Sequence, residues 1–128
     1  MSKGCDFVVI QGEKAVTIGD RNPVWETTFK ISGRHHPRQA FLIFNVRHLT
    51  YADVAVKIND HEVGVIHHHD NWRVFQDHWF TQMINIGSGI LESGKNKICI
   101  KAERLPPDPA DDNEYDDFNL KDVICFCQ

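Results

Sequence analysis

Apolar and polar residues alternate along this 128-residue chain in short runs, and turn-forming residues separate the runs. The alternation is clearest over residues 53–58 and 97–103. A period of two puts successive side chains on opposite faces of a β-strand, whereas an amphipathic helix repeats every 3.6 residues. No segment keeps the helical period, and we expect at most one helical turn, at residues 49–52. The pattern predicts an all-β chain that folds as an antiparallel β-sandwich of eight or nine strands.

Nine segments carry the strand pattern. They are residues 7–10, 15–18, 27–31, 40–46, 54–58, 63–66, 80–86, 98–102 and 118–127. The first two flank Gln-Gly-Glu-Lys, which predicts a hairpin. Residues 40–46 are apolar almost throughout, as expected of a central strand buried on both faces. In the last segment we expect Phe118, Leu120, Ile124 and Phe126 to alternate with Val123, Cys125 and Cys127.

Chain length and charge narrow the class of protein. A chain of 128 residues suits one domain, so we expect a single domain over residues 1–128. The net charge is −4 without a basic patch, which argues against nucleic acid as a partner. No apolar run is long enough to span a membrane, and the N-terminus lacks the apolar core of a secretory signal. We therefore expect a cytoplasmic protein with no membrane partner and with reduced thiols.

Three segments, in order, carry a resemblance to a known family. Residues 56–64 are similar to the strand–turn–strand motif "V-x-V-N-G-x-x-V-G" of galactose-binding-like jelly rolls, with Asp60 in place of the usual Gly. Residues 90–100 resemble their "L-x-x-G-x-N-x-I-x-I" passage, in which Gly94 permits a turn and Asn96 can bond its backbone. Residues 117–124 are similar to the closing strand of carbohydrate-binding modules. The resemblance spans about residues 40–127 and implies jelly-roll topology.

The same resemblance implies a structural calcium ion with Glu13 and Asp117 as candidate ligands, because related modules often hold one near the first and last strands. Residues 108–117 carry six carboxylates, and hard cations prefer oxygen ligands. The alternative is a solvated acidic loop whose like charges keep it extended. Calcium is therefore one possible cofactor.

Eight histidines are present, and His67, His68 and His69 are consecutive. On a strand, His67 and His69 point to the same side and could share a transition metal, with Asp70 or His61 as a third ligand. The alternative is a polar loop whose histidines bond to neighbours or solvent. A small histidine-rich metal-binding protein is therefore one hypothesis.

The segment from His67 to Trp79 combines aromatic, amide, carboxylate and guanidinium groups in an expected loop. Sugar sites need an aromatic face for the C–H side of the ring and polar groups for its hydroxyls. The expected ligand-binding residues are Asp70, Asn71, Trp72, Arg73, Trp79, His68 and His69. The alternative is that Trp72 and Trp79 cap one end of the core.

The chain lacks a nucleophile elbow, a His-Glu-x-x-His helix and a Gly-rich dinucleotide turn, so we expect no enzyme activity. The leading hypothesis is a non-catalytic, lectin-like module that binds a carbohydrate or another hydroxyl-rich ligand through loops at one end of the sandwich. A second hypothesis is a structural or protein-interaction jelly roll that forms homo-oligomers through an exposed sheet face. Its candidate surfaces are the face of Lys97, Cys99 and Lys101, and the two-sided apolar last strand.

Overall fold

A computed structural model describes residues 6–31, 39–69, 77–110 and 114–127. Within these residues the chain forms nine β-strands and no helix, which confirms the predicted all-β class. The strands are β1 (Asp6–Gln11), β2 (Val16–Ile18), β3 (Val24–Ile31), β4 (Ala40–Arg47), β5 (Val54–Ile58), β6 (His61–Ile66), β7 (Phe80–Ile86), β8 (Gly94–Lys101) and β9 (Phe118–Cys127). Residues 49–52, where at most one helical turn was expected, contain a bend and no helix.

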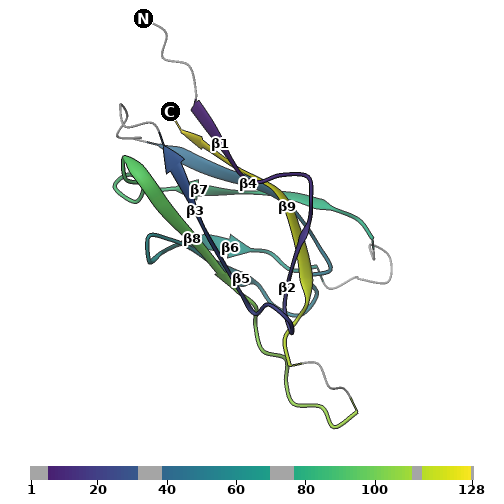
Figure 1. The fold of residues 1–128 in the computed structure, drawn as a ribbon. Coiled ribbons are helices and arrows are strands. Elements are labelled where there is room, and N and C mark those ends of the chain that lie inside the picture. Colours follow the sequence, from purple (N-terminus) through teal and green to yellow (C-terminus); the bar gives the residue numbers. More distant parts are fainter. Residues whose placement is uncertain (1–5, 32–38, 70–76, 111–113, 128) are drawn as a thin grey trace, which may run out of the picture.

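The strands form two antiparallel sheets that face each other (Figure 1). One sheet has the order β1-β9-β4-β7, with β2 also paired to β9, and the other has the order β3-β8-β5-β6. Because β1 and β2 both pair with β9, they act as one interrupted first strand. With β1 and β2 counted as the first strand, β3 becomes the second strand and β9 the eighth. The sheet orders are then 1-8-3-6 and 2-7-4-5. This is the strand order of a jelly roll.

The core lies between the sheets and is built from every second residue of the strands. In β4 the residues alternate between buried and half-buried along the whole strand. Phe44, Phe118 and Ile98 are at most 1% exposed. Trp25 is also buried and belongs to this core. Among the described residues, no helix is long and apolar enough to cross a membrane.

Two turns follow the sequence prediction closely. Asn59 and Asp60 have φ angles of 51° and 67°, as a tight turn between antiparallel strands requires. The buried Asn96 donates hydrogen bonds from Nδ2 to the carbonyls of Glu92 (2.9 Å) and Gly94 (3.2 Å), which confirms that it bonds its own turn. Its Oδ1 also accepts from Asn59 Nδ2 at 2.8 Å, so one pair of amides holds both turns together.

The first two strands do not form the predicted hairpin. Phe7 pairs with Phe126 and Val16 pairs with Leu120, so β1 and β2 lie end to end along β9 and not beside each other. The two strands therefore do not pair with each other, because both pair with β9 at successive positions along it.

Strand β9 contains a β-bulge. Ile43 of β4 pairs with Ile124 and Asn45 pairs with Lys121, so two steps along β4 match three along β9. The extra step includes Asp122, whose φ of 51° lies in the left-handed region. Its backbone N–H donates to Gly12 O at 2.9 Å.

The bulge reverses the phase of the strand and overturns the predicted alternation. Before it, Phe118 and Leu120 face the core. After it, Ile124 and Phe126 are only half-buried and point away from the other sheet. The inward positions there are Val123, Cys125 and Cys127.

Candidate functional site

The outer face of the five-stranded sheet, which is turned away from the other sheet, holds the candidate site. Strand β4 crosses the middle of this face, and its outward residues are Phe41, Ile43, Asn45 and Arg47. They are half-buried, so the expectation that this strand is buried on both faces is wrong. The first two are apolar and the last two are polar, and this change divides the outer face into an apolar half and a polar half.

The apolar half comes from four strands. It consists of Phe7, Val9, Phe41, Ile43, Met83, Ile124 and Phe126. Phe7, Val9 and Met83 are 62%, 53% and 58% exposed, which is high for side chains of this kind. The ring of Phe126 stacks on Phe41 with centroids 5.1 Å apart and lies 6.0 Å from Phe7. These contacts make the apolar half one continuous surface.

A shallow hollow of about 480 Å³ borders the apolar half where β4 begins and β7 ends. Its apolar part is formed by Phe41, Ala40 and Ile86, and its polar rim by Gln39, Asn85, Gly87 and Ser88. It holds no cluster of titratable groups among these lining residues.

The polar half is organised by hydrogen bonds between neighbouring strands. In one row, Thr81 donates to Asn45 Oδ1 (2.6 Å), and Asn45 Nδ2 donates to Asp122 Oδ2 (3.0 Å). In the next row, Arg47 Nε donates to Asn119 Oδ1 at 3.1 Å, and Asn119 Nδ2 donates to Thr17 Oγ1 at 2.8 Å. These bonds fix the directions of amide, hydroxyl and carboxylate groups on a rigid sheet.

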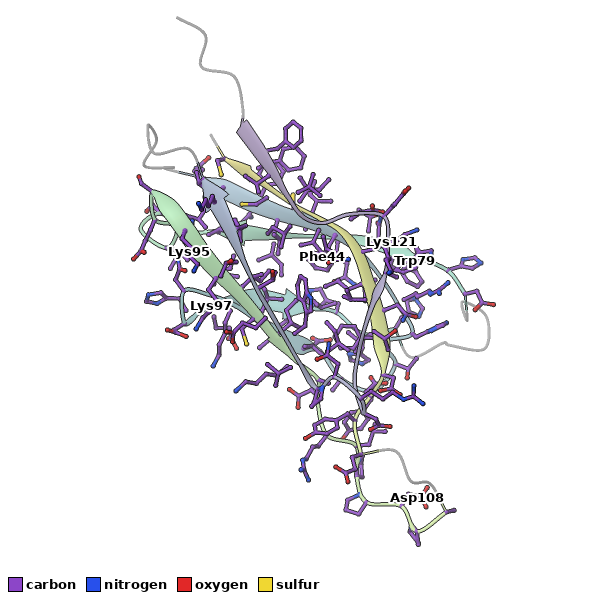
Figure 2. The ribbon with its side chains drawn as sticks, in the orientation of Figure 1. Phe44, Trp79, Lys95, Lys97, Asp108 and Lys121 are labelled. Carbon is purple, nitrogen blue, oxygen red and sulfur yellow. The ribbon has the colours of Figure 1, made fainter. Side chains whose placement is uncertain are left out.

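Trp79 lies beside this polar half, just before β7 begins. The Arg47 guanidinium carbon is 4.5 Å from the centroid of the Trp79 ring, and Lys121 Nζ is 4.3 Å from it. Figure 2 shows Lys121 and Trp79 together at one end of the five-stranded sheet. Two cations against one indole ring give cation–π attraction and keep the ring in place. Trp79 is half-buried, so part of the ring remains accessible.

The three consecutive histidines do not continue a strand, because β6 ends at Ile66. The Nδ1 atoms of His67 and His68 lie 3.3 Å and 2.6 Å from the carboxylate of Asp53. The ring of His69 instead stacks on Phe80, with centroids 4.8 Å apart. The structure therefore joins His67 to His68 through one carboxylate, while His69 contacts a different residue, Phe80.

Asp53 also accepts from the backbone N–H of His68 at 3.0 Å. This bond and the contact with the His68 ring lower the pKa of Asp53, because both favour its ionised form. The described residues contain no group of three or more His, Cys, Asp or Glu side chains that could hold a metal ion. Together, these hydrogen bonds hold the segment that follows β6 in place.

Of the seven predicted ligand-binding residues, His68, His69 and Trp79 are described. The other four, Asp70, Asn71, Trp72 and Arg73, lie outside the described residues. The described part of the prediction therefore rests on Trp79, since His68 and His69 bond or stack within the fold.

The predicted calcium ligands lie at opposite ends of β2. Glu13 follows Gly12, whose carbonyl bonds to Asp122. Asp117 precedes this Asp122 by five residues, which corresponds to about 15 Å along a β-strand. Asp117 accepts from the backbone N–H of Asp20 at 2.6 Å. The structure thus gives this carboxylate a backbone partner and does not bring it to Glu13.

The acidic segment around Asp117 also serves the fold. Asp20 Oδ1 accepts from the backbone N–H groups of Glu114 and Tyr115 at 2.9 and 2.7 Å. A β-carbon on Gly19 would overlap the Asp117 carboxylate, so glycine permits this close approach. Asp108, in contrast, is exposed on a loop that projects from the sandwich (Figure 2).

The face of Lys97, Cys99 and Lys101 is the outer face of the four-stranded sheet. Lys97 Nζ is 3.6 Å from the carboxylate of Asp60, and Cys99 is half-buried. Burial raises the pKa of the Cys99 thiol, and the nearby Glu26 adds to this effect. This face therefore carries both charged and uncharged side chains, unlike the apolar half of the other sheet.

Sequence reasoning missed most of the polar half, above all Arg47 and Lys121. The local signal was the change from Phe41 and Ile43 to Asn45 and Arg47 at alternate positions of one strand. That change marks where the outer face turns polar, but the partners on β7 and β9 follow only from strand pairing.

No protein-family model matches the sequence, and a search of curated proteins finds no match.

Proposed function

We propose that this chain is a non-catalytic carbohydrate-binding module whose ligand site is the polar half of the outer face, centred on Trp79. The observation that carries the proposal is an indole ring held by Arg47 and Lys121 beside fixed hydrogen-bonding rows. The predicted residues Asp70, Asn71, Trp72 and Arg73 precede Trp79 and remain part of the proposed site.

The chemistry of a saccharide suits this arrangement. A sugar ring presents C–H groups that pack on an aromatic surface and hydroxyls that need both donors and acceptors. Asn45, Asn119 and Thr81 supply both kinds of group, and their hydrogen bonds already fix their orientation. Preorganised groups lose less conformational entropy when a ligand binds. Among the described residues of this half, Arg47 and Lys121 outnumber the one carboxylate, Asp122, so we propose that acidic saccharides bind best.

The fold gives weaker support. Its strand order is that of a jelly roll, and three segments resemble galactose-binding-like members of that class. The same sandwich carries many unrelated functions, so the proposal depends on the site and not on the fold.

Screening the purified protein on an array of neutral and acidic oligosaccharides, followed by titration calorimetry, tests the proposal. We expect binding of at least one glycan, and at least a tenfold loss of affinity for Trp79→Ala, about 1.4 kcal/mol. Trp79→Phe should recover part of it, since an aromatic surface remains. Lys121→Gln should weaken acidic glycans more than neutral ones.

The matched control is Tyr51→Ala, which removes an aromatic side chain that is 45% exposed and belongs to the segment between β4 and β5. It should bind like the wild type. Trp72→Ala belongs in the same series and should also abolish binding while the melting temperature stays nearly unchanged. The proposal is wrong if the array detects no glycan, or if Trp79→Ala binds as tightly as the wild type.

A further inference from the structure

We propose that the apolar half of the outer face is the interface of a symmetric homodimer. This surface is separate from the polar half, and it has no role in the proposed carbohydrate site. Its occupant is a second copy of this chain, packed face to face through the same seven side chains.

The bulge in β9 turns apolar side chains outward on this face. Without the bulge at Asp122, the alternation begun by Phe118 and Leu120 would carry Ile124 and Phe126 into the core. A non-glycine residue in the left-handed region costs about 1 kcal/mol, so the bulge has an energetic cost. Its result is to add two large apolar side chains to the surface that Phe7, Val9 and Met83 leave exposed.

The exposed area of the apolar half is large enough for a stable dimer. With full side-chain areas of about 150–200 Å², the three exposed side chains present roughly 300 Å² and the four half-buried ones roughly another 150 Å². The apolar half thus has about 450 Å² of apolar surface. A standard interface removes about 800 Å² per partner, of which a little over half, again about 450 Å², is apolar. The apolar half therefore matches the apolar part of a standard interface, and neighbouring polar residues can form its rim.

The uncharged composition of the apolar half favours a second copy of the chain as its partner. The seven side chains include no charged group, so nothing on this surface selects a partner of opposite charge. A two-fold axis instead repeats the same surface on both copies, which makes it self-complementary. The outer face of a sheet is also a broad surface, and sheets pack face to face about 10 Å apart.

The direction of the two-fold axis follows from the polar half. An axis in the contact plane and parallel to the strands would set Arg47 and Lys121 against the same cations of the second copy. An axis across the strands overlaps only the apolar halves and carries the two polar halves to opposite ends of the dimer. We infer the second arrangement, because like charges in contact are unfavourable.

Light scattering coupled to size-exclusion chromatography, with sedimentation equilibrium over about 1–100 μM, tests the inference. The wild type should have twice the monomer mass. Val9→Lys and Met83→Lys should each weaken dimerisation at least tenfold, because each places a charge inside the contact. Both positions are more than half exposed in the monomer, so both variants should remain folded by circular dichroism.

Val24→Lys is the matched control, since Val24 is an apolar strand residue, 42% exposed, on the other sheet. It should remain dimeric. A wild type that stays monomeric up to 100 μM would overturn the proposal, even if the surface binds another partner. So would a dimer that survives both Val9→Lys and Met83→Lys. Glycan binding by the monomeric variants should persist, which separates this test from that of the carbohydrate site.

Discussion

Asp116 and Asn96 are the two polar residues that are buried in the described part of the chain. Asp116 is 6% exposed, and its Oδ2 accepts from the backbone N–H groups of Thr50 (3.2 Å) and Tyr51 (2.9 Å). These bonds tie the segment after β4 to the segment before β9. Burial raises the pKa of Asp116, although the two N–H bonds oppose the change. The carboxylate thus serves as an acceptor in a place that disfavours its charge.

The raised pKa of Asp116 predicts a pH dependence of stability. Between its ordinary and its raised pKa, the folded protein holds this proton more firmly than the unfolded chain does. The contribution of Asp116 to the free energy of unfolding therefore falls as the pH rises through that window. Asp116→Asn keeps an acceptor oxygen but does not ionise. Its stability relative to the wild type should increase from pH 4 to pH 7, as measured by urea unfolding at each pH.

Glu13→Gln is the control for this series, because Glu13 is an exposed carboxylate. Its stability relative to the wild type should change little over the same pH range. A difference between Asp116→Asn and the wild type that stays constant with pH would mean that Asp116 does not titrate differently in the folded protein.

At the scale of a secondary-structure element, the bulge in β9 decides which side chains reach the outer face. Asp122 tolerates the left-handed backbone, and its carboxylate accepts from Asn45. A β-branched side chain does not tolerate this backbone. Asp122→Val should therefore lower the free energy of unfolding by about 2 kcal/mol, while Asp122→Gly should change it by less than about 1 kcal/mol. Thermal and urea unfolding of the two variants measure the difference.

Thr28→Val provides the comparison, since Thr28 is an exposed residue of β3 outside the positive-φ positions. We expect a change within about 0.5 kcal/mol there. If Asp122→Val is as stable as the wild type, the left-handed residue is not needed and the strand can continue without its bulge.

Elements with a local cause could be predicted from the sequence. The turn at Asn59 and Asp60 and the bonds of Asn96 depend on residues a few positions apart, and both agree with the prediction. The bulge could not be predicted, because it depends on how β9 aligns with β4. The failed hairpin has the same cause, since β1 and β2 have a common partner far along the chain.

The candidate site shows the same limit. Trp79 was predicted as a ligand-binding residue from its local setting, yet its partners Arg47 and Lys121 are 32 and 42 residues away. The end of the strand at Ile66 agrees with the prediction, but the carboxylate that then holds His67 and His68, Asp53, lies on a distant part of the chain. Alternation shows which residues face outward, while the groups that meet there depend on tertiary pairing.

At the scale of the whole molecule, the two faces of the five-stranded sheet have different roles. Phe44 is 1% exposed and lies in the centre of the sandwich (Figure 2), whereas Phe41, three residues earlier on the same strand, lies on the outer face. Their side chains are identical, so a comparison isolates the effect of the face. If the apolar half serves a second copy, it should add little to the stability of the monomer.

Phe44→Ala should lower the free energy of unfolding by about 3–5 kcal/mol, because it leaves a cavity in the core. Phe41→Ala should cost less than half as much, mostly through lost stacking on Phe126. Both are best measured by urea unfolding in the Met83→Lys background, where dimerisation no longer contributes. A cost for Phe41→Ala equal to that for Phe44→Ala would make the apolar half a part of the monomer's own core. A small cost means that its exposed area is available to stabilise the contact between two copies.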